Sequence, residues 1–181
     1  MAVPDVLAQD LAVVFCGINP GAASAVAGHN FIGGSNRFWR AIYLAGFTPD
    51  RLAAQDELRL LDYGCGLTAA VARPTRGAAE LSRAELAAAA DPLQRKISQY
   101  APRTIAFLGK AVYAAIVARR DLSWGPRPER FAGAAVWLLP NPSGLNRAFN
   151  LAQLVEAYGA LRLAIAADLA RFTAAEPRRR T

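Results

Sequence analysis

The chain has 181 residues, of which 54% are hydrophobic and 19% are charged, and its formal net charge is +7. These values favour one compact soluble domain with a large core. Two cysteines and one histidine are too few for a disulfide framework, an iron–sulfur cluster or a tetrahedral zinc site, so we expect no metal and no cofactor.

Strands and helices alternate along the chain. Three apolar runs are typical of buried strands, at residues 11–16, 103–108 and 135–139. Helices are predicted from about residue 36 to 45, at 54–63, at 82–90, from residue 91 toward the second strand, at 111–119 and at 150–172. The remaining Gly- or Pro-rich segments, 21–34, 64–77 and 121–130, are predicted to be loops.

This order of elements predicts a three-layer α/β/α sandwich with a central, mostly parallel sheet. We assign residues 1–175 to a single domain. Residues 176–181 form a basic tail that we expect to be frayed.

The sequence shows no signal for export or membrane insertion. Its amino end lacks the basic-then-apolar pattern of a signal peptide, and no uninterrupted apolar stretch reaches the roughly 18 residues that span a bilayer. The small number of cysteines is typical of a reducing compartment. We therefore expect a cytoplasmic protein that does not bind membranes. It is expected to be a monomer, because no large apolar surface stripe is evident.

The turn Gly17-Ile18-Asn19-Pro20-Gly21 follows the first predicted strand. Glycine lets a backbone approach a ligand closely, and Asn19 adds an amide that can orient a water or contact a base edge. The carboxyl ends of parallel strands are where ligands bind in such sheets. The turn lacks the GxGxxG spacing and the lysine of nucleotide-binding loops, and a simple tight turn remains an alternative.

A second turn follows the third predicted strand and has a similar composition. It reads Asn141-Pro142-Ser143-Gly144-Leu145-Asn146-Arg147. Ser143 and Gly144 allow close approach to a phosphate, and an apolar Leu145 beside polar and cationic groups suits insertion into a base stack. The alternative is that Leu145 folds back onto the core.

Basic residues are almost all arginine, since Lys96 and Lys110 are the two lysines. The planar guanidinium binds phosphates well, and a positive net charge attracts polyanions. Arginine bias can equally reflect genome composition, so charge alone leaves nucleic-acid binding open.

Together, these two turns resemble the mismatch-specific uracil-DNA glycosylase family, which is related to the thymine-DNA glycosylases. Further segments fit the same family: Asn36-Arg-Phe-Trp39, Ala45-Gly-Phe47, Leu61-Asp-Tyr63 with Cys65-Gly66, and Leu108-Gly-Lys110. The resemblance covers roughly residues 11–163. It implies an enzyme that removes uracil from double-stranded DNA, typically opposite guanine, by hydrolysis of the N-glycosidic bond, leaving an abasic site.

The resemblance also implies a role for individual residues. Asn19 would place the attacking water. Gly17 and Ile18 would line the base pocket, and the Ile18 backbone N–H would bind the base. Phe31 would stack on the extruded ring, and Asn141 would lie near the base. The DNA-binding residues would be Ser143, Gly144, Leu145, Asn146 and Arg147. Asn146 stands where some relatives have Ser, and His29 and Asn30 receive no role.

Two further residues are candidates on chemical grounds. Asp91 begins a predicted helix and could bring a carboxylate near the cleft to assist Asn19, although a helix cap is the simpler interpretation. Lys110 follows a strand end, where an amine could form a Schiff base or contact a phosphate.

Other functions stay open at this point. A related glycosylase could prefer ethenocytosine, thymine or uracil in single-stranded DNA. A non-catalytic module could use Leu145 and Arg147 to bind mismatched DNA without cleaving any bond.

Overall fold

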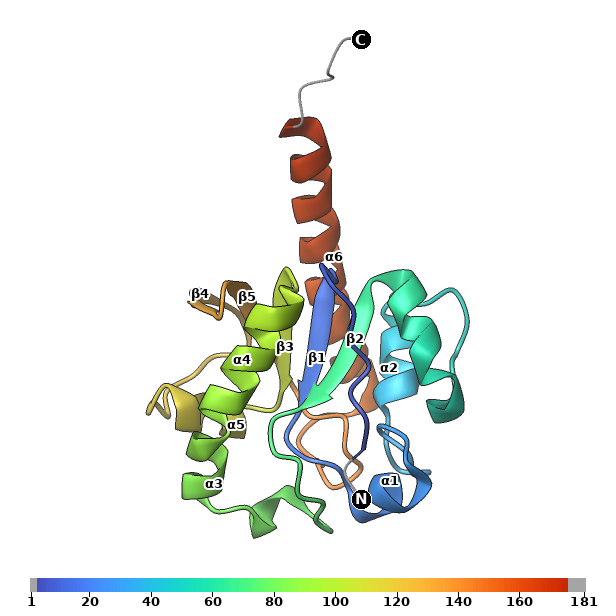
Figure 1. Ribbon diagram of the computed structural model, residues 1–181. Helices are drawn as coiled ribbons and strands as arrows, with labels where there is room; N and C mark the ends of the chain where they lie inside the picture. Colours follow the sequence, from blue (N-terminus) through green and yellow to red (C-terminus); the bar gives the residue numbers. More distant parts are fainter. Residues whose placement is uncertain (1–2, 176–181) are drawn as a thin grey trace.

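The computed structural model describes residues 3–175 and shows a five-stranded sheet with helices on both faces (Figure 1). The strands are β1 (Val13–Gly17), β2 (Cys65–Ala69), β3 (Thr104–Leu108), β4 (Gly125–Phe131) and β5 (Ala134–Leu139). The helices are α1 (Ala22–Ala27), α2 (Phe38–Leu44), the 3-10 helices η1 (Ala54–Tyr63) and η2 (Ala78–Glu80), α3 (Arg83–Ala88), α4 (Ala90–Tyr100), α5 (Ala111–Ile116) and α6 (Leu151–Ala175). The predicted basic tail, 176–181, lies outside the described residues.

The strands lie in the order β2-β1-β3-β5-β4. β1 pairs in parallel with β2 and β3, and β3 pairs in parallel with β5, whereas β4 runs antiparallel to β5. The predicted α/β sandwich with a mostly parallel sheet is confirmed. The four parallel strands all end at one edge, which is the lower edge in Figure 1.

Each face of the sheet has its own apolar core, because alternate side chains of a strand point to opposite faces. Val13 and Phe15 of β1 pack with α2, η1 and α6. Val14 and Cys16 alternate with these residues along the strand, so they point to the opposite face and pack with α3, α4 and α5. Both faces of β1 are therefore buried, which explains its continuous apolar sequence.

Two strands and one short helix occupy segments that the sequence predicted to be loops, so those predictions were wrong. β2 and β4 are the outermost strands of the sheet, and α1 lies within the expected loop 21–34. β4 contains Pro126 and Pro128, which an edge strand tolerates because its outer N–H groups need no ladder partner. Its pairing with β5 also shifts register between Arg127 and Arg130.

Ser82 before α3 and Ser35 before α2 are residue types that favour helix N-caps, as is Asp91, but only Ser82 acts as one. Ser82 caps α3, where the Glu85 backbone N–H donates to Ser82 Oγ at 3.1 Å and the Ser82 N–H donates to Glu85 Oε2 at 2.9 Å. Ser35 does not cap α2; instead the Phe38 N–H donates to Asn36 Oδ1 at 3.0 Å. Asp91 is not a cap either, because α4 already begins at Ala90.

The long helix α6 packs against α2 and the end of the sheet and then extends beyond the body of the molecule (Figure 1). Tyr158 of α6 is fully buried, and its hydroxyl donates to the Pro140 carbonyl at 3.2 Å. This bond ties α6 to the chain where it leaves β5. None of the helices among residues 3–175 combines the length and apolar content needed to cross a lipid bilayer.

Gly66 in β2 provides a test of this packing. A Cβ at this position would lie 2.6 Å from Leu11 Cδ1 and 2.7 Å from the Val6 carbonyl oxygen, and the backbone oxygen cannot easily move. We expect Gly66→Ala to lower the free energy of unfolding by about 1–3 kcal/mol, measured by urea denaturation.

Gly159 is the matched control, because a Cβ there would meet nothing within 4 Å and the residue lies inside α6. Gly159→Ala should raise the free energy of unfolding by about 0.5–1 kcal/mol. Equal effects of the two substitutions would contradict the packing described for β2.

Candidate functional site

A cavity of about 130 Å³ lies at the carboxyl edge of the parallel strands. It is lined by seven of the residues selected from the sequence, namely Gly17, Ile18, Asn19, Phe31, Asn141, Ser143 and Leu145. The other candidates do not line it, namely Asp91, Lys110, Gly144, Asn146 and Arg147. The structure thus brings two turns that are distant in the sequence to one cavity.

The side-chain amide of Asn19 is held in one orientation. Its Nδ2 donates to the Arg73 carbonyl at 2.9 Å, to Thr75 Oγ1 at 2.8 Å and, less directly, to the Pro20 carbonyl at 3.3 Å. Carbonyl oxygens only accept hydrogen bonds, so the nitrogen must face them. The Asn19 Oδ1 atom receives no hydrogen bond from a described residue and remains an acceptor for a ligand or water.

Thr75 completes this arrangement. Its hydroxyl donates to the Gly77 carbonyl at 2.9 Å, so its oxygen is the acceptor for Asn19 Nδ2. The Thr75 backbone N–H donates to the Pro20 carbonyl at 3.1 Å, which joins the segment to the first turn. The Thr75 side chain is buried. Thr75 therefore holds the side-chain amide of Asn19 in its orientation.

Residues 73–77 are held in turn by two glutamates. Glu80 Oε1 accepts the backbone N–H groups of Arg76 and Gly77, at 2.9 and 3.1 Å. Glu85 accepts a hydrogen bond from Arg73 Nε at 2.9 Å. Hydrogen bonds from the Ser82 backbone and from Arg73 lower the pKa of the Glu85 carboxyl, so it stays charged at neutral pH.

Phe31 forms an aromatic wall of the cavity. Its ring stacks on Phe38 of α2, with centroids 4.2 Å apart and planes 23° apart. Gly17 lies beside this ring, since a Cβ there would be 3.5 Å from Phe31 Cζ, an ordinary van der Waals contact. Phe31 also has a positive φ of 53°, an uncommon conformation for an aromatic residue, which the packing against Phe38 holds in place.

The second turn is stabilised by its own side chains. Asn141 Oδ1 accepts the Ser143 N–H at 2.9 Å, and Asn146 Nδ2 donates to the Asn141 carbonyl at 2.9 Å. Asn146 is thus used inside the turn. Because Asn141 Oδ1 faces Ser143, its Nδ2 is directed away and is available as a donor.

Gly109, at the end of β3, lies where the two turns meet. A Cβ on this residue would be 3.6 Å from Ile18 Cδ1 and 3.7 Å from Asn141 Nδ2. Its φ of 105° is also a conformation that favours glycine. Gly109 therefore lets the chain turn sharply away from the cavity between the first and second turns.

The guanidinium of Arg37 is surrounded by the second turn. It donates to four backbone carbonyls of that segment: Nε to Pro142 at 3.3 Å, Nη2 to Ser143 at 2.7 Å and to Asn146 at 2.9 Å, and Nη1 to Phe149. The Arg37 backbone N–H adds a bond to the Pro142 carbonyl at 3.0 Å. The ion pairs found among residues 3–175 do not include this arginine, so its charge is balanced by carbonyl dipoles.

Ser35 supports the same turn by close packing. A Cβ on Gly144 would lie 2.4 Å from Ser35 Cβ and 2.8 Å from the Ser35 carbonyl oxygen. Gly144 is therefore required by a neighbouring segment of the protein itself. Residues 35–37, which precede α2, support residues 142–149. Below, residues 35–37 are called the socket and residues 142–149 the insertion loop.

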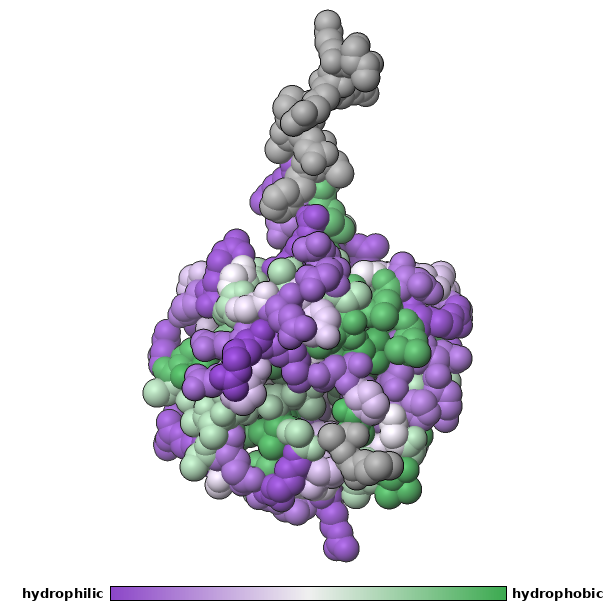
Figure 2. All heavy atoms as spheres, in the orientation of Figure 1, coloured by the Kyte–Doolittle hydropathy of each residue, from purple (hydrophilic) through white to green (hydrophobic). Residues whose placement is uncertain are grey.

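Leu145 is the apolar tip of the insertion loop, and the residue is 76% exposed. It borders the cavity beside Gly77, where a Cβ would lie 3.7 Å from Leu145 Cδ1. The alternative that Leu145 folds back onto the core is therefore wrong. Hydrophilic residues dominate the face shown in Figure 2, and apolar patches are scattered between them.

Two exposed arginines, Arg76 and Arg147, belong to the segments that border the cavity. Arg76 lines the cavity, and Arg147 is two residues from Leu145. Both are exposed, and among the described residues neither guanidinium forms an ion pair. The rim of the cavity therefore carries positive charge that is free to meet an anion.

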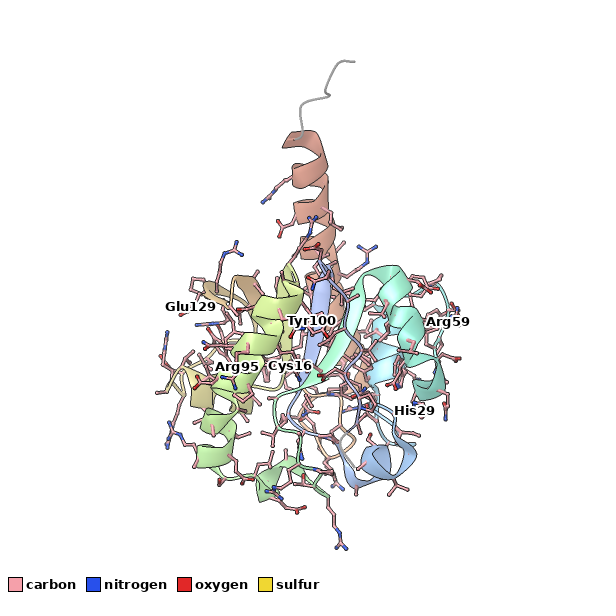
Figure 3. The ribbon with its side chains drawn as sticks, in the orientation of Figure 1. Cys16, His29, Arg59, Arg95, Tyr100 and Glu129 are labelled. Carbon is pink, nitrogen blue, oxygen red and sulfur yellow. The ribbon has the colours of Figure 1, made fainter. Side chains whose placement is uncertain are left out.

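Lys110 and Asp91 lie elsewhere. Lys110 Nζ sits 4.3 Å from the ring centroid of Trp124, in a cation–π contact. Asp91 is exposed and lines a separate hollow on α4 with Arg95, which Figure 3 labels. The structure does not bring the Asp91 carboxylate to the cavity, because α4 carries it on an outer face of the molecule.

A buried acidic group that the sequence did not suggest supports the other side of the cavity. Glu57 of η1 accepts the Asn30 backbone N–H at 2.8 Å and Asn30 Nδ2 at 3.0 Å, both through Oε2. Its other oxygen lies 3.0 Å from His29 Nδ1, and His29 is found beside α1 in Figure 3. Asn30 lines the cavity next to Phe31.

Sequence reasoning missed the supporting residues Asn30, Ser35, Arg37, Glu57 and Thr75. Each acts through a partner in a distant segment, which no local spacing reveals. The one available signal was Arg37 inside the short motif Asn36-Arg-Phe-Trp39, which fits the family resemblance but does not reveal a role for this arginine.

Cys16, at the end of β1, is an inert thiol (Figure 3). Burial raises the pKa of Cys16 to about 12, and likewise raises the pKa of Cys65 to about 12. The thiolate is the nucleophilic form, so neither sulfur is reactive at neutral pH. Within residues 3–175, no group of three or more His, Cys, Asp or Glu side chains is arranged to hold a metal ion.

The close approach of Gly144 to Ser35 generates a direct test. In Gly144→Ala the new methyl group must push the insertion loop off the socket, so the backbone amides of Leu145 and Asn146 should exchange with deuterium at least tenfold faster. Gly21→Ala is the control, because a Cβ on Gly21 would meet nothing within 4 Å. Unchanged exchange in Gly144→Ala would show that the loop does not rest on Ser35.

Two comparisons with known proteins agree with this geometry. Residues 4–162 match the family model of the uracil DNA glycosylase superfamily. The solution NMR structure of a Methanosarcina acetivorans protein described as a candidate uracil DNA glycosylase is similar in fold, with a TM-score of 0.61 and 19% identity over 90% of this chain and 96% of that chain. Since the family model spans most of the sequence, the chain belongs to the uracil DNA glycosylase superfamily.

Proposed function

We propose that this protein extrudes uracil, typically opposite guanine, from double-stranded DNA and hydrolyses its N-glycosidic bond, leaving an abasic site. Superfamily membership supports a DNA glycosylase that removes uracil during base-excision repair. The observation that carries the finer proposal is the shared cavity. It is bordered by an oriented Asn19 amide on one side and by the exposed Leu145 on the other.

Asn19 is the group proposed to place the attacking water. Its fixed Nδ2 bonds leave Oδ1 as an acceptor, which suits one proton of a water whose oxygen then points at the sugar. A neutral amide is a weak base. The reaction must therefore rely on departure of the uracil anion and on positive charge at the sugar, which the DNA phosphates help to stabilise.

The base pocket supplies groups that fit the departing uracil. Phe31 offers an aromatic face backed by Phe38, which suits stacking on a planar ring. Donors aimed at developing negative charge stabilise it strongly in a site that excludes water. The Ile18 backbone N–H and Asn141 Nδ2 are the donors proposed for this role, and Gly17 lines the pocket beside them.

Base extrusion costs a few kcal/mol, and a mispaired base costs least. Leu145 is proposed to fill the vacated stack, with Ser143, Gly144, Asn146 and Arg147 approaching the opposite guanine and the backbone. Uracil opposite guanine is such a mispaired base, so its extrusion costs less than that of uracil in a well-paired target. The free guanidinium groups of Arg76 and Arg147 suit neighbouring phosphates.

Water is the proposed nucleophile throughout, so no covalent intermediate is expected. Lys110, the candidate for a Schiff base, lies on the Trp124 ring and does not line the cavity. Its position supports a monofunctional glycosylase. Borohydride should trap no enzyme–DNA adduct, and a trapped adduct would overturn this part of the proposal.

The proposal is tested with a labelled duplex that holds one G·U pair, followed by alkali to break the strand at any abasic site. We expect a break at the uracil, and no break in a matched G·C duplex. Tight binding without a break would instead indicate the non-catalytic mismatch-binding module. Parallel duplexes with ethenocytosine or thymine, and a single-stranded uracil substrate, define the lesion range.

Asn19→Ala should lower the single-turnover rate on the G·U duplex by about 10²–10³-fold, the scale of losing one preorganised hydrogen-bonding group in an active site, while DNA affinity stays within about twofold. Gln94→Ala, on the outer face of α4, is the control. Near-normal turnover in Asn19→Ala would remove this residue from the mechanism.

Thr75→Val tests whether the amide orientation matters. The substitution removes both hydrogen bonds of the hydroxyl, the one that it accepts from Asn19 Nδ2 and the one that it donates to the Gly77 carbonyl. Loss of the bond to Asn19, worth about 0.5–1.5 kcal/mol, should lower the single-turnover rate by about 2- to 10-fold. Thr75→Ser keeps the hydroxyl and should restore the rate. Equal rates for the Val and Ser variants would show that this hydroxyl does not position Asn19.

A further inference from the structure

We propose that Arg37 is a positioning residue that holds the insertion loop in its DNA-entering shape before DNA binds. This inference rests on the proposed function, because it concerns the loop that would fill the vacated stack. Arg37 does not line the catalytic cavity. Its effect is therefore exerted through the loop and not on the reacting atoms.

The contacts of Arg37 define the path of the loop. Its guanidinium reaches the carbonyls of Pro142 and Ser143 on one side of Leu145, and those of Asn146 and Phe149 on the other. Four carbonyl oxygens can meet one guanidinium only if the backbone curves around it. The apex of that curve is Leu145, which is left exposed.

The shape of the side chain explains why arginine is used. Its five N–H donors lie in one plane and point in fixed, separate directions, whereas a lysine ammonium is a compact group with three donors. Lysine at position 37 could satisfy some of these carbonyls but could not span from Pro142 to Phe149. The remaining carbonyls would turn to water, and the loop would lose its curvature.

The socket limits the loop from a second direction. Ser35 touches Gly144 so closely that no side chain fits between them. Arg37 therefore anchors both arms of the loop, while Ser35 supports its apex near Leu145. A loop that is ordered in advance loses less conformational freedom on binding, so more of the contact energy with DNA is available to extrude the base.

This role differs from a general effect on stability. Loosening the loop should weaken base extrusion, and the loss should be larger for a well-paired A·U target than for a G·U target, which is easier to open. The chemical step on a base that needs no extrusion should be unaffected. A merely structural role would lower all of these activities together.

The test compares Arg37→Lys with Arg162→Lys. Arg162 is a matched control, since its Nε also donates to a backbone carbonyl, that of Gly46 at 3.1 Å, but on α6 away from the cavity. The probe is a duplex that carries a non-hydrolysable 2′-fluoro deoxyuridine with a neighbouring 2-aminopurine, whose fluorescence rises when the stack opens. We expect the rise at saturating protein to fall at least fivefold in Arg37→Lys and to be unchanged in Arg162→Lys.

Two further variants keep the proposal testable if Arg37→Lys is unstable. Gly144→Ala loosens the same loop and leaves Arg37 intact, so it should give the same loss of fluorescence. Leu145→Ala removes the tip, and combining it with Arg37→Lys should add little to either single effect, because both act on one step. Additive effects, or a normal fluorescence rise in Arg37→Lys and Gly144→Ala, would overturn the proposal.

The outcome is separable from that of the proposed function. If the wild-type protein opens the stack but releases no uracil from the G·U duplex, the proposed hydrolysis fails and the role of Arg37 stands. If the wild type releases uracil and Arg37→Lys releases it at the wild-type rate from both A·U and G·U targets, the role of Arg37 fails and the hydrolysis stands.

Discussion

Parallel pairing of β1, β3 and β5 brings the two turns that border the cavity to one edge of the sheet. Three adjacent strands that run in one direction deliver their following turns to the same edge of the sheet. The end of β3 bends away at Gly109, which lies next to both Ile18 and Asn141, and the turns after β1 and β5 line the same cavity. Two segments that are far apart in the chain thereby enclose a single space. The two cores on the faces of the sheet keep that register fixed.

The chemistry of the cavity depends on which atom of each amide faces inward. Around Asn19, carbonyl oxygens and an already committed Thr75 hydroxyl occupy the nitrogen side, so an acceptor faces the cavity. Around Asn141, a backbone N–H occupies the oxygen side, so a donor is presented. The same residue type thus supplies opposite polarities at two points, and the difference comes from backbone groups of neighbouring segments. This arrangement is suited to a ligand with both donors and acceptors, as a nucleobase is.

The sequence predicted the sheet type, the three central strands and the two turns, because continuous apolar runs and Gly/Pro turns are local signals. It did not reveal β2 or β4, since Gly66 weakens the first pattern and Pro126 and Pro128 disguise the second. Supports such as Arg37 and Thr75 were also missed. Their function lies in bonds to main-chain oxygens of remote segments, and an arginine or threonine looks the same in the sequence whether or not such bonds exist. Asp91 shows the converse error, because a suitable residue type at a suitable element end lies on the wrong face of its helix.

The anchoring of residues 142–149 has a consequence for how this protein can change. Every acceptor that Arg37 uses is a main-chain oxygen, so the anchorage does not depend on the side chains at positions 145 and 147. Those two positions are open to substitution without releasing the segment from its support. The backbone shape of the insertion loop is therefore independent of which side chains stand at positions 145 and 147. A library varied at positions 145 and 147 alone would sample new target preferences on an unchanged frame.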